Sequence, residues 1–241
     1  WFLNKLFESE QAIVDAAFAD SLPLADPLGS YERHYLRGAF TVHMLRSLIG
    51  EKAFAKGLKR LMKKHAYGWA NSTDVLSAFQ KYTRVDLNKF RTQWIEKPGA
   101  PVFRLGVREN GNRRALAAEG VRVRDWHDAA YDMDISVHFY NGENLLNKTE
   151  IPIRGGTGMI DFPAEATHFE IDPMNTCMAY FIDLSPVEMR VNCALYSDNP
   201  IIAYHQFERL VARQELLSTD STLAIRLLNH PSQIARKLAI E

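Results

Sequence analysis

The chain has no excess of charge of either sign, because 29 Lys and Arg residues balance 29 Asp and Glu residues. A neutral chain has no global electrostatic attraction for nucleic acid or for an anionic membrane, so we expect no nucleic-acid partner. Long apolar runs are missing too. None approaches the roughly 18 to 20 residues of a membrane-spanning helix, and the sequence predicts no membrane segment. Residues 1–5 lack the basic region of a signal peptide.

Cysteine is scarce, with only Cys177 and Cys193 in the chain. The two cysteines can form one disulfide, but we expect two buried free thiols because disulfides are rare inside cells. The compartment stays open, with the cytoplasm favoured. The Gly155 to Gly158 stretch lacks the Gly-Lys-Ser/Thr of a phosphate-binding loop, so we expect a turn there.

Histidines in a metal-binding arrangement are also missing. A helical zinc site of the His-Glu-x-x-His type needs two imidazoles four residues apart with a glutamate after the first. No two histidines of this chain have that spacing, and none is followed by Glu. The eight are His34, His43, His65, His127, His138, His168, His205 and His230. We therefore expect no metal site within the chain.

What the sequence does contain is enough apolar residues, 46%, to bury a core. Helical spacing dominates residues 1–97, with predicted helices near 2–18, 33–49 and 51–65 and two more that begin after Asn71 and at Asp86. The helix over 33–49 buries a row spaced by four residues: Leu36, Phe40, Met44 and Leu48. The next helix is expected to bury Phe54, Leu58, Leu61, Met62 and His65. Its remaining face is basic and is expected to be solvated: Lys52, Lys56, Lys59, Arg60, Lys63 and Lys64.

After Pro101 the hydrophobic period changes from four to two, which indicates half-buried strands. Alternating runs cover 103–107, 131–139, 169–171 and 178–184, and Asn141-Gly142 predicts a hairpin turn. Short strands at this spacing favour a β-sandwich. Helical spacing returns after Pro186, with helix starts at Asn199-Pro200, near Ser218 and near His230. These short helices suit the beginning of an α-solenoid.

Three segments in order carry a family resemblance. They are Tyr35-Leu36-Arg37-Gly38-Ala39 before an apolar helix, then His65-Ala66-Tyr67-Gly68, then Trp94 with Pro98-Gly99-Ala100-Pro101. Together they resemble the aminopeptidase N-like zinc metallopeptidases, the gluzincin aminopeptidases. The resemblance implies an α+β multidomain fold. Residues 1–97 would form the helical lobe of a thermolysin-like catalytic domain, 98–187 an antiparallel β-sandwich, and 188–241 the beginning of a C-terminal helical domain.

The resemblance also implies a function for a longer parent protein. Members of this family bind zinc through His-Glu-x-x-His and a distant glutamate, so we expect the ligands upstream of Trp1 and this chain to be a C-terminal portion. The parent would hydrolyse amino-terminal residues from peptides, and the chain alone is expected to be inactive. Its partners would be a peptide substrate and the rest of the parent polypeptide. The alternative is an aminopeptidase-like scaffold that has lost its metal ligands and serves as a protein-interaction subunit.

Tyr35 is the one candidate catalytic residue. It matches the family tyrosine that donates a hydrogen bond to the substrate oxygen as negative charge develops in the transition state. A phenol suits this role because it is a neutral donor at ordinary working pH. Tyr31 is spaced differently from the family's second tyrosine and is assigned to packing or loop, while Arg37 is expected to support the loop. Side-chain specificity and oligomeric state are not predicted.

Overall fold

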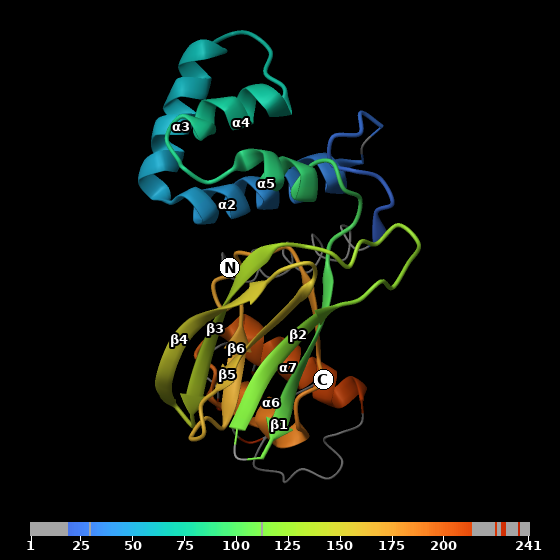
Figure 1. Ribbon diagram of the computed structural model, residues 1–241, viewed down its shortest axis with the longest axis vertical. Helices are drawn as coiled ribbons and strands as arrows, with labels where there is room; N and C mark the ends of the chain where they lie inside the picture. Colours follow the sequence, from blue (N-terminus) through green and yellow to red (C-terminus); the bar gives the residue numbers. More distant parts are fainter. Residues whose placement is uncertain are drawn as a thin grey trace.

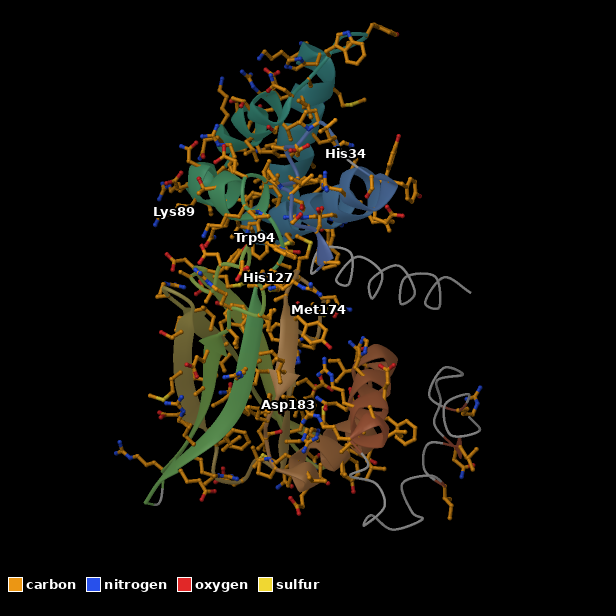
Figure 2. The ribbon with its side chains drawn as sticks, turned by 90° about the vertical axis from the view of Figure 1, so that its right-hand side faces the viewer. His34, Lys89, Trp94, His127, Met174 and Asp183 are labelled. Atoms are coloured by element: carbon orange, nitrogen blue, oxygen red, sulfur yellow. The ribbon has the colours of Figure 1, made fainter. Side chains whose placement is uncertain are left out.

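The computed structural model describes residues 19–28, 30–111 and 113–213, together with Ile225, Leu228, Asn229 and Arg236. It is an α+β structure in which a group of helices leads into two β-sheets, and two further helices lie along one side of the sheets (Figures 1 and 2). None of the helices in these ranges is long and apolar enough to cross a membrane.

Five helical segments form the first part of the structure. They are η1 Glu32–Arg37, α2 Gly38–Ile49, α3 Glu51–Lys64, α4 Ser72–Gln80 and α5 Leu87–Trp94. The predicted helix over 33–49 is confirmed, but its first segment, η1, is a π-helix that continues directly into α2. Gly50, with φ of +79°, ends α2. The helix predicted near 2–18 lies outside the described residues.

The starts of α4 and α5 follow the capping signals in the sequence. Asn71 and Asp74 form a reciprocal capping box, in which the Asp74 N–H donates to Asn71 Oδ1 at 2.9 Å and the Asn71 N–H donates to Asp74 Oδ2 at 3.2 Å. Asp86 accepts from the Asn88 N–H at 2.9 Å. Both predicted caps are confirmed.

Three apolar side chains predicted on buried faces are exposed instead. Leu48 is 47% exposed, Leu58 43% and Met62 68%, whereas Phe40 and Met44 are buried as expected. The reason is that the apolar arcs of α2 and α3 are wider than the surface that neighbouring elements cover. Periodicity shows which residues share a face, but the neighbours decide how much of that face is buried.

The strands form two sheets. The first has the order β5-β2-β1-β7 and the second β4-β3-β6. Their bounds are β1 Val102–Asn110, β2 Arg113–Gly120, β3 Met133–Asn141, β4 Asn144–Ile153, β5 Thr157–Phe162, β6 His168–Ile171 and β7 Tyr180–Asp183. The expectation of purely antiparallel sheets is wrong for one pair, since β7 runs parallel to β1 with Val102 opposite Tyr180. β7 reaches this edge by crossing from the second sheet, a path that local alternation does not specify.

Two predicted turns join the strands. Gly142 has φ of +55° in the β3–β4 hairpin, as the Asn141-Gly142 pair predicts. Gly155 and Gly156 have φ of +57° and +83° in the turn before β5. A Cβ atom at Gly156 would lie 2.0 Å from Ala129 O, so this position has no room for a side chain.

One continuous core joins the helices to both sheets. Phe139 of β3 and Phe162 of β5 contact edge to face across the sheets, with ring centroids 5.0 Å apart. Trp94 at the end of α5 packs on Tyr131 with centroids 5.3 Å apart. Figure 2 shows Trp94 where the helices meet the sheets. Both cysteines are buried free thiols, as expected.

The last described helices, α6 Val187–Tyr196 and α7 Pro200–Ala212, pack beside the sheets through buried polar contacts. The Ser197 hydroxyl donates to Glu170 Oε1 at 2.5 Å, and Gln206 Nε2 donates to Asp183 Oδ2 at 3.1 Å. The start of α7 at Pro200 agrees with the sequence, whereas α6 was not predicted as a separate helix. The predicted helices after Ser218 and His230 fall almost entirely outside the described residues, so the solenoid stays a prediction.

Candidate functional site

Tyr35 lies within the π-helix η1, between the proline-containing loop of residues 20–28 and α2. The Gly38 N–H donates to Arg33 O, five residues earlier, which is the hydrogen bond that defines a π-helix. Single π-helical turns are rare and often occur at functional sites, because the extra residue re-aims the side chains beside it. The sequence did not predict this local geometry.

The Tyr35 ring stacks on the Tyr31 ring, with centroids 5.0 Å apart and an interplanar angle of 24°. Tyr35 is 67% exposed and Tyr31 63%, so the two rings form an aromatic pair on the surface. The structure thus brings together two tyrosines that the sequence assigned different roles. Tyr35 projects away from the core, and its catalytic role stays a prediction.

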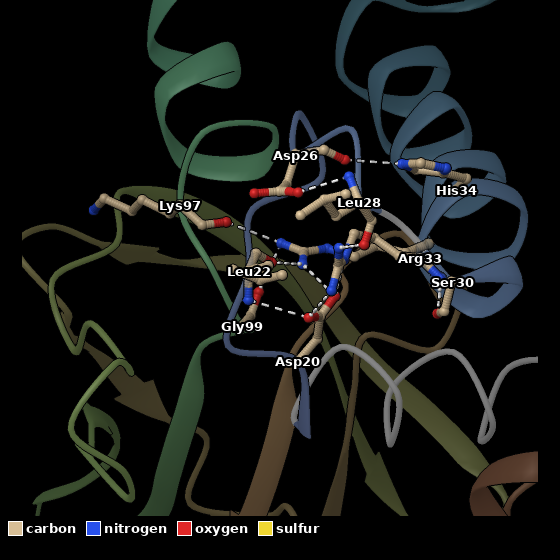
Figure 3. Close-up of polar contacts among 10 residues, drawn as sticks. Asp20, Leu22, Asp26, Leu28, Ser30, Arg33, His34, Lys97 and Gly99 are labelled. Atoms are coloured by element: carbon tan, nitrogen blue, oxygen red, sulfur yellow. Dashed lines mark hydrogen bonds and ion pairs between the residues drawn. The ribbon is translucent and has the colours of Figure 1, made fainter.

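Arg37 anchors the segment that carries Tyr35. It is 1% exposed and donates to three backbone carbonyls, Lys97 O at 3.0 Å, Gly99 O at 2.9 Å and Leu22 O at 3.3 Å (Figure 3). Burial lowers the pKa of Arg37 from its ordinary value, although Asp20 lies 3.7 Å away. One side chain therefore joins η1 to the loop before it and to the segment that leads into β1. This geometry agrees with the expected supporting role.

Arg33 makes a second, bidentate anchor that sequence reasoning missed. Its guanidinium donates to both carboxylate oxygens of Asp20, at 2.5 and 2.6 Å, and to Leu28 O at 3.0 Å. Burial acts to raise the pKa of Asp20, but hydrogen bonds from Arg33 and the Leu22 N–H, together with the charges of Arg33 and Arg37, outweigh that effect and lower it. The available signal was the four-residue spacing of Arg33 and Arg37, which puts both cations on one side of a helix.

A cavity lies elsewhere, where α2 and α5 meet β3 and β4. Its volume is about 640 Å³, with an apolar floor that includes Met44, Phe90 and Met133. Arg154 and Asp134 form an ion pair at its rim, 2.8 Å apart. Tyr35 does not line this cavity. Residues that are distant in sequence build it, so local patterns did not predict it.

No metal-binding cluster is found in the part of the chain that the structure describes. In those residues no three His, Cys, Asp or Glu side chains lie together in a way that would hold an ion. The donor set of the described residues therefore does not by itself fit a zinc site.

Comparisons with known proteins place part of the chain in a family. The family model described as the peptidase family M1 domain matches residues 25–94. Aminopeptidase N of Lactococcus lactis subsp. lactis is 40% identical over 73 residues, which is 30% of this chain and 9% of that protein. Leucyl aminopeptidase of Saccharolobus solfataricus is 31% identical over 158 residues, 66% of this chain and 17% of that protein. The chain thus spans less than a fifth of the length of these relatives.

A solved structure shares the fold. The crystal structure of Legionella pneumophila aminopeptidase A in complex with aspartic acid matches with a TM-score of 0.67, covering 84% of this chain and 25% of that chain. Its sequence identity is 12%, so this likeness concerns the fold alone. The segment of residues 25–94, which contains the π-helix and Tyr35, thus matches the peptidase family M1, and the similar proteins support an M1 aminopeptidase-like family.

Proposed function

We propose that this chain is a C-terminal portion of a zinc-dependent aminopeptidase that removes amino-terminal residues from peptides. The family match over residues 25–94 supports this proposal. In it, residues 1–97 complete the catalytic domain, 98–187 form a β-sandwich and 188–241 begin a helical domain. The single observation that carries it is an exposed Tyr35 on a segment that Arg37 anchors through three carbonyls.

The proposed role of Tyr35 is transition-state stabilisation. As the scissile peptide bond is attacked, negative charge develops on its carbonyl oxygen, and the phenol O–H donates a hydrogen bond to that oxygen. A donor held in place before the reaction lowers the barrier more than it improves substrate binding. Stacking on Tyr31 restricts the ring, while the 67% exposure leaves its surface open to a substrate.

Zinc, when bound, would supply the Lewis-acid chemistry of the reaction. In this proposal its ligands belong to the parent polypeptide upstream of Trp1. The described residues contribute the tyrosine and the frame that holds it: Arg37 joins the π-helix to Lys97 and Gly99, just before β1.

The test uses the full-length parent with its metal site in place. Tyr35→Phe removes one hydrogen bond and keeps the ring, so kcat is expected to fall on the order of 10² to 10³ with KM nearly unchanged. Tyr31→Phe is the matched control, and its effect should be much milder. Steady-state kinetics at equal zinc occupancy decide the matter. A Tyr35→Phe enzyme within about threefold of the parent in kcat would contradict the proposed role.

The scaffold alternative predicts a different result. A parent that has lost its metal ligands would show no hydrolysis for Tyr35→Phe to reduce and no bound zinc. Metal content and aminoacyl-substrate hydrolysis of the unmutated parent therefore separate the two functions before any variant is made.

A further inference from the structure

The α3 helix has an apolar arc that its neighbours cover only in part. Phe54 and Gly57 face α4, where Phe54 stacks on Phe79 with centroids 5.0 Å apart. Leu58 and Met62 lie on the adjoining row, at about 100° of rotation per residue, and are exposed. This row is a strip of apolar surface with no partner in the described part of the chain.

The loop after α3 extends the same apolar surface. Tyr67 is fully exposed and Trp69 is 97% exposed. The loop has a defined shape, since His65 Nδ1 lies 2.8 Å from Trp69 O and the Gly68 N–H donates to His65 O. Figure 1 shows α3 and this loop at the end of the molecule opposite the sheets. Large aromatic side chains at a protruding tip are typical of proteins that contact a membrane interface.

The other side of the apolar row is strongly basic, although the whole chain is neutral. Residues 52–64 contain six cations and no carboxylate. Of these six cations, only Lys64 has an acidic partner among the described residues, Asp74 at 3.6 Å. The nearby Glu51 pairs instead with Arg46 at 2.6 Å. Five of the cations and Tyr82 line an open depression of about 520 Å³. The face that they form consists of Lys52, Lys56, Lys59, Arg60, Lys63 and Lys64.

We propose that α3 and the loop of residues 65–71 dock this protein on an anionic lipid surface. Leu58, Met62 and Trp69 would enter the headgroup region, and the basic face would lie over anionic headgroups. An exposed helix with an apolar row beside lysines is the arrangement of interfacial amphipathic helices. The attraction is local, since salt limits it to about 10 Å, so a neutral chain does not oppose it.

Two features favour a lipid surface over nucleic acid. Five of the six cations are lysines, whose ammonium groups act as point charges, whereas arginine is the side chain suited to bidentate phosphate recognition. The exposed apolar row also has no role in contacts with a phosphate backbone. This inference does not depend on the proposed peptidase function.

The experiment is vesicle co-sedimentation of the 241-residue chain and of the full-length parent. Vesicles contain either phosphatidylcholine alone or phosphatidylcholine and phosphatidylserine in equal amounts. We expect both proteins to bind the anionic vesicles and to dissociate from them at high salt. Neither protein should bind the neutral vesicles. The variant Lys56→Gln/Lys59→Gln/Lys63→Gln should weaken binding by about a hundredfold, at roughly 1 kcal/mol per cation.

Two further variants sharpen the test. Trp69→Ala should reduce binding at unchanged charge, whereas Lys89→Gln/Arg108→Gln/Lys148→Gln removes three exposed cations elsewhere and should leave binding unchanged. Circular dichroism confirms that each variant is folded. Equal loss in both triple variants would overturn the proposal. So would failure of the full-length parent to bind, because another part of the parent polypeptide would then cover this face. Binding of an RNA or DNA duplex without vesicle binding would assign the face to nucleic acid instead.

Discussion

At the scale of single residues, Arg37 connects more of the chain than any motif suggests. Its guanidinium is buried, and its two terminal nitrogens donate to carbonyls of residues 22, 97 and 99. We expect Arg37→Met to destabilise the 241-residue chain by about 3 to 5 kcal/mol, because the carbonyls and Asp20 lose a buried cation. Arg37→Lys should recover only part of this, since one ammonium does not reach all three acceptors. Urea denaturation gives the free energy of unfolding.

The matched control for Arg37 is Arg46, which pairs with Glu51 at the surface. Its side chain is 50% exposed, so Arg46→Met should cost less than about 1 kcal/mol. If both methionine variants unfold at the same urea concentration, the buried carbonyl contacts of Arg37 add no more to the free energy of unfolding than the surface ion pair of Arg46. The sequence predicted that Arg37 supports the loop, but not its partners, which lie 15 to 62 residues away.

His168 gives a prediction about pH. It is fully buried between the rings of Tyr140 and Tyr196, and burial lowers its pKa from 6.5 to about 4. Between these values the unfolded chain binds a proton that the folded chain does not. The free energy of unfolding therefore falls as the pH drops from about 6.5 to about 4, by on the order of 3 kcal/mol from this residue.

The measurement compares urea denaturation of the unmutated 241-residue chain and of its His168→Gln variant across this pH range. Asp172, whose pKa burial raises to about 6, acts in the opposite direction, but it is present in both proteins and cancels in the difference. The unmutated chain should lose more stability on acidification than the variant does. Parallel pH profiles would show that His168 is protonated in the folded chain as readily as in the unfolded chain.

At the scale of elements, the turns provide a matched pair of glycines. Gly142 and Gly156 both have positive φ, but a Cβ at Gly142 meets nothing within 4 Å, whereas one at Gly156 meets the Ala129 carbonyl. Gly142→Ala should cost about 1 to 2 kcal/mol for the left-handed backbone alone. Gly156→Ala should cost several kcal/mol more, because the β4–β5 turn must move. Thermal unfolding of both variants tests this, and equal losses would show that the turn adjusts freely.

The elements also show what local sequence specifies. The caps at Asn71 and Asp86 and the hairpin at Asn141-Gly142 were predictable, because each depends on hydrogen bonds or φ angles within a few residues. The parallel pairing of β7 with β1 was not, since it depends on which sheet edge the chain reaches. The π-helix under Tyr35 was also missed: the motif pointed to the residue, but the long-range contacts of Arg33 and Arg37 on the same segment are not visible in the local sequence.

At the scale of the whole molecule, the remaining prediction concerns zinc. Tight binding needs three or four ligands about 2.0 to 2.3 Å from one ion, and the described residues contain no cluster of three candidate side chains. We expect the isolated 241-residue chain to retain no stoichiometric zinc after dialysis and to leave aminoacyl reporter substrates intact. Its melting temperature should not respond to a chelator, because an ion that does not bind the folded state does not stabilise it.

The full-length parent is the positive control for this zinc experiment. Under the proposed function it keeps one zinc through the same dialysis, hydrolyses the reporter and melts earlier with a chelator. The two proteins share Tyr35 and its anchors, so a difference between them shows what the rest of the parent polypeptide contributes. One zinc held tightly by the 241-residue chain would place the ligands within it. That result would contradict the proposal that the ligands lie upstream of Trp1. Zinc-free behaviour of both proteins would instead favour the scaffold alternative, with the π-helix and its tyrosine pair kept for binding rather than catalysis.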